Sequence, residues 1–144
     1  MEHLVLDASV VLKWYFNDEA HGQKALDILS KYISNDINIV APSLLEYEVV
    51  NGLIIAQKRG RIEDNKINIA IDGFYDLGIK LKNLAWCYQK VFSYCKTYHC
   101  SAYDASYLVI AEDEGITMVT SDERLYNQVK KDLKWVQWLG DVKI

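Results

Sequence analysis

Residues 101–124 constrain the fold of this chain more than any other stretch. The sequence SAYDASYLVIAEDEGITMVTSDER contains a helix start, a glycine stop, a β-branched run and a second helix start. Ser101 and Asp104 have the spacing of a capping box, which satisfies free backbone N–H groups at a helix N-terminus. Gly115 favours the end of that helix, and the run ITMVT is typical of a short strand. One carboxylate, Asp104, is thus expected to open a helix, and another, Asp122, to follow a strand.

The same alternation of strand and helix extends along the whole chain. Apolar and β-branched runs predict strands at 3–6, 37–40, 78–81, 117–120 and 134–138. Helical spacing predicts helices at 10–16, 17–33, 43–57, 64–75, 83–98, 101–114 and 125–131. Pro42 is expected in the first turn of one helix and Asn83 as the cap of another. Such alternation favours an α/β fold, with a parallel sheet covered by helices on both faces.

Length and composition favour an ordered globule. A chain of 144 residues is expected to form a single domain, residues 1–144, with its own core. The content of 51% hydrophobic residues, with 1 Pro and 7 Gly, argues against a disordered or linker-rich chain. The net charge of −4 argues against a broad positive surface for nucleic acid. It does not exclude an enzyme whose metal ions offset clustered carboxylates.

Several absences in the sequence favour a soluble cytoplasmic protein. The three cysteines, Cys87, Cys95 and Cys100, form no CxxC pair, and their odd number fits a reducing compartment. The N-terminal sequence MEHLVLDASV has no basic region or cleavage site of a signal peptide. No window approaches the roughly 18 apolar residues of a membrane span.

Four acidic residues are predicted to meet at one edge of the sheet. Asp7 and Asp122 each follow a strand, and parallel strands place their carboxyl ends at the same edge. Asp104 opens a helix, and Glu48 lies in the helix that follows the second strand. The nearby Glu46 leaves open which of the two glutamates faces this edge.

Carboxylates gathered at one place repel one another, by roughly 4 kcal/mol for a pair 4 Å apart at an effective dielectric near 20. Protons or cations must therefore neutralise them. Oxygen ligands without a cysteine or histidine set favour Mg²⁺ or Mn²⁺, as one or two ions. Each acid taken alone can instead be a helix cap or a solvated helix residue. The residue pattern by itself leaves a metal site and a set of helix caps both open.

Four segments of the chain resemble a PIN domain of the VapC type. They are VLDASVVLKWYF, APSLLEYEVVNGLIIAQKRGRI, SAYDASYLVIAEDEG and TMVTSDERL, in the order and spacing of that family. The resemblance implies a three-layer α/β/α fold with strand order 3-2-1-4-5. It also implies Mg²⁺- or Mn²⁺-dependent endoribonuclease activity, typically as the toxin of a toxin–antitoxin pair. The implied metal-binding and catalytic acids are Asp7, Glu48, Asp104 and Asp122. The implied supporting polar groups are Ser9, Asn51, and Thr120 or Ser121.

Basic and aromatic residues indicate where partners could bind. The candidates for contacts with RNA phosphates are Lys13, Lys58, Arg59 and Arg61, for which a solvated surface is the alternative interpretation. The 4 tryptophans and 10 tyrosines exceed what a small core needs. Some are therefore expected in a homodimer interface or in a groove for a cognate antitoxin.

Other functions fit the same pattern of residues. A receiver-like domain also carries acids at a sheet edge, but it needs a lysine at the end of a late strand, where this chain has Trp138-Leu139-Gly140. A non-catalytic interaction module of the same fold would keep the acids only for folding. A PIN-type nuclease acting in RNA processing or quality control is a further alternative.

Overall fold

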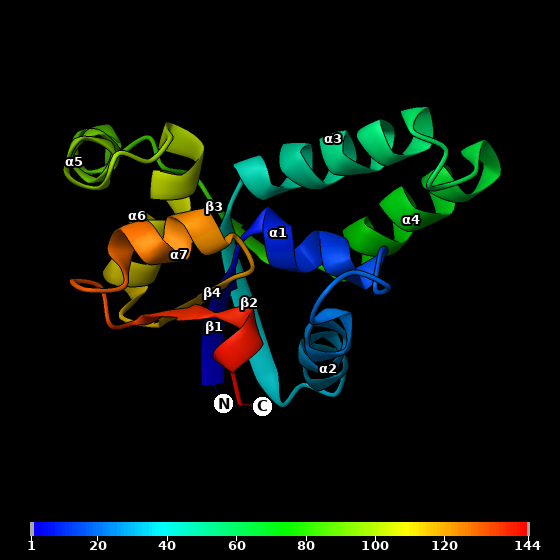
Figure 1. Ribbon diagram of the computed structural model, residues 1–144, viewed down its shortest axis with the longest axis horizontal. Coiled ribbons are helices and arrows are strands. Elements are labelled where there is room, and N and C mark those ends of the chain that lie inside the picture. Colours follow the sequence, from blue (N-terminus) through cyan, green and yellow to red (C-terminus); the bar gives the residue numbers. More distant parts are fainter. Residues whose placement is uncertain (1, 144) are drawn as a thin grey trace.

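A parallel five-stranded sheet forms the centre of the computed structural model, which describes residues 2–143 (Figure 1). The strand order is β3-β2-β1-β4-β5, and every neighbouring pair is parallel. The strands are β1 (Glu2–Leu6), β2 (Ile37–Pro42), β3 (Lys80–Lys82), β4 (Thr117–Thr120) and β5 (Val136–Trp138). The predicted α/β class and the order 3-2-1-4-5 are confirmed.

Helices cover both faces of the sheet and complete a three-layer α/β/α architecture (Figure 1). The helices before β3 are α1 (Ala8–Val11), α2 (Gly22–Ile33), α3 (Leu44–Lys58) and α4 (Asp64–Asp76), with the 3₁₀ turn η1 (Leu12–Trp14). They lie on one face. The other face carries α5 (Tyr88–Tyr98), α6 (Ala102–Glu114) and α7 (Glu123–Val129), and the 3₁₀ turn η2 (Leu139–Asp141) follows β5. This division follows from right-handed crossovers that run first toward β3 and then toward β5.

The core lies between the central strands and the helices on each face. Val5, Leu6 and Val119 in the two central strands are fully buried. Helix α6 is buried from Ala105 to Ala111, because it packs over the middle of the sheet. Burial on both faces explains why these strands are short continuous apolar runs. Within residues 2–143, no helix combines the length and apolar character required to cross a bilayer.

Helix α3 contains the dipeptide Asn51-Gly52, which in other contexts favours a hairpin turn. A Cβ atom at position 52 would lie 2.6 Å from Cδ1 of Leu12. The missing side chain therefore lets α3 approach η1 closely. This close contact matters for the pocket described below, which lies between the same two elements.

Several element boundaries differ from prediction, and three of these differences have a clear local reason. Pro42 is the last residue of β2, because it pairs with Lys82 of β3, and α3 begins only at Leu44. The Asn83 side chain accepts a hydrogen bond from the Ala85 N–H at 2.6 Å, so it caps a turn, and α5 begins at Tyr88.

Helix α2 begins at Gly22, five residues after the predicted start at Asn17. The backbone N–H of Glu19 bonds the carbonyl of Phe16, and His21 has a left-handed φ of 62°. The carboxylate of Glu19 is held by basic side chains instead of capping the helix. The intervening residues therefore form turns.

Candidate active site at the carboxyl ends of the strands

Asp7 follows β1 at the centre of the sheet and is 5% exposed. The register pairs Leu6 with Val119, which places Asp7 beside Thr120, the last residue of β4. The Ser9 hydroxyl and the Val10 N–H donate to Oδ1 of Asp7 at 2.5 and 3.4 Å. The Thr120 hydroxyl donates to Oδ2 at 2.5 Å. Asp7 thus caps α1 and also bonds across to the neighbouring strand.

The turn after β4 is tied to the same network. The Asp122 N–H donates to the Thr120 hydroxyl at 3.0 Å, and the Ser121 N–H donates to the Ser9 hydroxyl at 2.9 Å. Oδ1 of Asp122 accepts from the Leu125 N–H at 3.2 Å and so caps α7. The two strand-to-helix turns are therefore joined by side-chain and backbone hydrogen bonds.

Glu48 lies on α3 and is oriented by a tyrosine on α6. The Tyr107 hydroxyl donates to Oε1 of Glu48 at 2.5 Å. Glu48 and Asn51 line one surface hollow, whereas Glu46 lines another, beside Phe74 and Leu81 on the β3 side. Glu48 is therefore the glutamate that faces the acidic site.

The charge of Asp104 acts on the other acids of the site. Burial raises the pKa of Asp7 to about 6, against the hydrogen bonds from Ser9, Thr120 and Val10, and the charge of Asp104 adds to the rise. Burial also raises the pKa of Glu48, with a further contribution from Asp104. The pKa of Asp104 itself is raised by burial and then by the charge of Asp122. Asp104 therefore lies within electrostatic reach of the other three acids, at the predicted edge of the sheet.

A divalent cation fits the chemistry of these side chains. Along residues 2–143, no three Asp, Glu, His or Cys side chains are gathered closely enough to form a ready-made metal centre. The donors are hard carboxylate oxygens, which Mg²⁺ and Mn²⁺ prefer. Burial and mutual repulsion disfavour the charges of Asp7, Glu48 and Asp104, and a cation among them would relieve that cost.

A family model for the PIN domain matches residues 4–131, which is most of the chain. This chain belongs to the PIN domain family. The curated protein Ribonuclease VapC3 of Pyrobaculum aerophilum is 24% identical to this PIN domain over 124 residues, covering 85% of this chain and 91% of that protein. The crystal structure of PAE2754 from Pyrobaculum aerophilum has a TM-score of 0.62 at 20% identity. That match covers 97% of this chain and 92% of the other, and it supports the fold.

The four basic residues that were predicted to contact RNA phosphates divide into two groups. Lys13 is 8% exposed and lies 3.4 Å from Oε1 of Glu19, while Arg61 donates to Oε2 of the same glutamate at 2.8 Å. Lys58 and Arg59 are exposed at the end of α3. Lys13 and Arg61 therefore contact the same carboxylate, that of Glu19. The spacing of the basic residues in the sequence does not predict this arrangement.

Sequence reasoning missed Tyr107 as a residue of this PIN domain's acidic edge. Tyr107 is 1% exposed. Its neighbours Leu108 and Ile110 are apolar and buried, so the sequence suggests that it is an ordinary core residue. Its position three residues after Asp104 on the same helix is the signal that was available. A helical residue at that spacing shares the face of the acid.

Proposed function

We propose that this PIN domain is a cytoplasmic endoribonuclease that hydrolyses RNA phosphodiester bonds with Mg²⁺ or Mn²⁺. The observation that carries the proposal is the network of hydrogen bonds at the carboxyl edge of the sheet, which joins the turns of Asp7 and Asp122 and holds Glu48 against the helix that Asp104 opens. The charge of Asp104 also acts on the carboxyl groups of Asp7 and Glu48. The relative named Ribonuclease VapC3 supports the same activity. We further propose that residues 1–144 act as one domain.

The four carboxylates would hold the metal, in the roles that the fold supports. Asp7 is the most rigidly held, since both of its oxygens accept hydrogen bonds. Ser9 and Thr120 orient it, and Ser121 fixes Ser9 in turn through its backbone N–H. When bound, Mg²⁺ or Mn²⁺ would activate a water molecule and offset the negative charge that develops at phosphorus.

The remaining side chains would position the metal ligands and the substrate. Tyr107 holds one oxygen of Glu48, and the other accepts no hydrogen bond within residues 2–143, so a ligand can bind it. Asp104 lies in the first turn of α6, and its backbone N–H is satisfied by Ser101 at 3.0 Å. Asn51 lines the hollow beside Glu48 and supplies a neutral amide for a ribose or phosphate oxygen.

A toxin role would require a cognate antitoxin, and we propose such a partner together with a homodimer. Large aromatic side chains are exposed on α3, on α6, and on or just before α5: Tyr47, Tyr103, Trp86, Tyr88 and Phe92. Tyr47 and Tyr103 line the same hollow as Glu48. Exposed aromatic residues are typical of protein interfaces and can also stack on unpaired bases. A role in RNA processing would use the same nuclease site without an antitoxin.

The test is incubation of purified protein with total RNA, with Mn²⁺ or with a chelator, followed by mapping of the cut ends. Cleavage by the wild-type chain in Mn²⁺, absent in chelator and in Asp104→Asn, is the expected result. A chain that binds no Mn²⁺ in calorimetry and leaves RNA intact would instead be a non-catalytic interaction module.

A further inference from the structure

A basic pocket lies directly beside the acidic site. It has a volume of about 300 Å³ and lies between η1 and the C-terminal half of α3. Ser9 and Ser121 line the end of the pocket next to Asp7. Its other lining residues include three cations and one acid: Lys13, Arg59, Arg61 and Glu19. A positive pocket is unexpected in a protein whose net charge is −4.

Lys13 is the unusual residue of this pocket, because a buried ammonium group needs partners to offset lost hydration. Its side chain donates one hydrogen bond in the described part of the chain, to Oε1 of Glu19 at the long distance of 3.4 Å. An ammonium group carries three donors. Lys13 can therefore donate to a second anionic oxygen, and a ligand bound in the pocket would supply that oxygen.

Glu19 serves as an internal anion between the two cations. One of its oxygens lies near Lys13 and the other accepts from Arg61 at 2.8 Å. Arg61 also lies 3.4 Å from Asp18 and stacks over Phe16 at 4.7 Å from the ring centre. Hydrogen bonding to Arg61 lowers the pKa of Glu19. Glu19 thus stays charged and holds Lys13 and Arg61 at the rim of one pocket.

The pocket is continuous with the acidic site through Ser9. Its hydroxyl donates to Asp7 and accepts from the Ser121 N–H, and both serines line the pocket. Without metal, a polyanion bound over the acids meets repulsion from four carboxylates, so cations beside them favour its binding. Lys13, Arg59 and Arg61 are the cations that this pocket offers.

We propose that this pocket binds a backbone phosphate of RNA adjacent to the cleaved bond. Lys13 and Arg61 bind the phosphate, and the phosphate displaces the carboxylate of Glu19 from them. This inference rests on the proposed ribonuclease function and assigns the position of its substrate. The occupant is a phosphodiester and not a base, because the polar lining contains cationic and hydroxyl donors that match phosphate oxygens.

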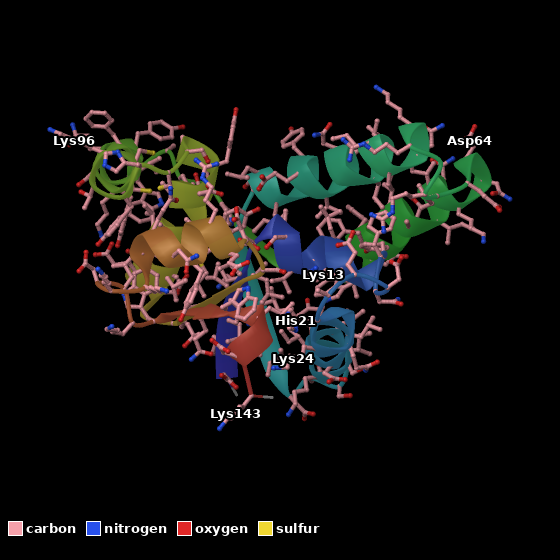
Figure 2. All side chains as sticks on the ribbon, viewed as in Figure 1. Lys13, His21, Lys24, Asp64, Lys96 and Lys143 are labelled. Atoms are coloured by element: carbon pink, nitrogen blue, oxygen red, sulfur yellow. The ribbon has the colours of Figure 1, made fainter. Side chains whose placement is uncertain are left out.

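The test measures binding of a labelled single-stranded RNA by fluorescence anisotropy in EDTA, so that no cleavage is required. Lys13→Met keeps the buried stem and removes the charge. It should weaken RNA binding about tenfold and lower the slope of log K against log salt by about 0.7. Arg61→Gln should act in the same direction. Lys96→Gln is the matched control, since Lys96 is exposed on α5, far from Lys13 (Figure 2).

Glu19→Gln separates the proposal from a simple loss of structure. Removing the competing anion should strengthen RNA binding by about threefold, which a damaged fold cannot do. Inorganic phosphate at matched ionic strength should compete more with the wild type than with Lys13→Met. Equal RNA affinity for the wild type, Lys13→Met and Glu19→Gln would overturn the proposal, as would an equal loss in Lys96→Gln.

Cleavage of RNA in Mn²⁺, measured in parallel, keeps this inference distinct from the proposed function. If the wild type cleaves RNA but the pocket variants bind RNA with unchanged affinity, the phosphate pocket is overturned and the proposed nuclease function stands. Altered affinities without any cleavage by the wild type would overturn the nuclease assignment and leave an RNA-binding pocket.

Discussion

The hydroxyl of Tyr107 donates a 2.5 Å hydrogen bond to Oε1 of Glu48 and so links α6 on one face of the sheet to α3 on the other. Tyr107 is 1% exposed, so this bond forms away from water. The charges of Glu48 and Asp7 both raise the pKa of Tyr107, after the larger effect of burial. The phenol therefore stays protonated and acts as a fixed donor between two acids of the site.

Replacing Tyr107 with phenylalanine removes that donor and little else. Glu48 then loses its charge-assisted hydrogen bond, so we expect stability to fall by about 1–2 kcal/mol. Because Glu48 is no longer held, Mn²⁺ affinity should fall by about tenfold. Urea unfolding and calorimetric titration with Mn²⁺ measure the two effects. Tyr103→Phe, on the exposed side of the same helix, is the control and should change neither. Unchanged Mn²⁺ affinity in Tyr107→Phe would remove Tyr107 from the site.

Asp104→Asn tests whether the acids repel one another. The charge of Asp104 raises the pKa values of Asp7 and Glu48, and its own pKa is raised by Asp122. In chelator, neutralising it should leave the melting temperature unchanged or raise it by about 3 °C, roughly 1 kcal/mol for a domain of this size. Mn²⁺ binding and cleavage should be lost. The control is Asp113→Asn, exposed on the same helix. A clear drop in melting temperature would mean that Asp104 serves mainly to stabilise the start of α6.

The pH dependence of metal-free stability tests the burial of Asp7. Its pKa is raised from 3.8 to about 6, so between these values the folded state keeps a proton that the unfolded state has lost. Stability should therefore fall as pH rises from about 4 to about 6, by an amount on the order of 3 kcal/mol, and should then level off. Glu48 and Asp104, also raised, contribute with the same sign.

Asp7→Asn isolates this contribution. In urea unfolding in EDTA, Asp7→Asn should be more stable than the wild type near neutral pH. This difference in stability should shrink as the pH falls toward 4. A difference that does not depend on pH would show that the ionised carboxylate is not penalised in the folded state.

The positions of Asp7 and Asp122 were predictable because they depend on local pattern alone. A buried strand followed by an acid and a helix places that acid at the carboxyl edge of a parallel sheet, whatever surrounds it. Asp104 was predictable for a similar reason, since Ser101 caps its helix as the capping box requires. The resemblance to the PIN family supplied the strand order, which periodicity cannot determine.

The features that were not predictable depend on contacts between distant segments. Tyr107 lies among apolar residues in the sequence. It can orient Glu48 only because the fold brings α3, and with it a glutamate 59 positions away, next to its hydroxyl. Lys13 has the spacing of a surface residue, yet it is buried beside Glu19. Helix α2 starts late for the same reason, because Glu19 bonds Lys13 and Arg61 instead of opening the helix.

Thr120→Val tests the link between the two central strands. The Thr120 hydroxyl is fully buried, donates to Oδ2 of Asp7 and accepts from the Asp122 N–H. Valine has nearly the same shape but leaves both groups without this partner. We expect a loss of about 1–3 kcal/mol in urea unfolding and a further rise in the pKa of Asp7, because a hydrogen bond that lowers it is gone.

Thr117→Val is the matched control for that variant. Thr117 begins the same strand and, three positions away, points to the opposite face of the sheet. It should unfold like the wild type. NMR titration of Asp7 in EDTA separates the two effects of Thr120→Val, since lost packing lowers stability without moving the pKa of Asp7. If the titration of Asp7 is the same in wild type and Thr120→Val, the hydroxyl does not control the carboxylate, and Ser9 and the Val10 N–H must orient it.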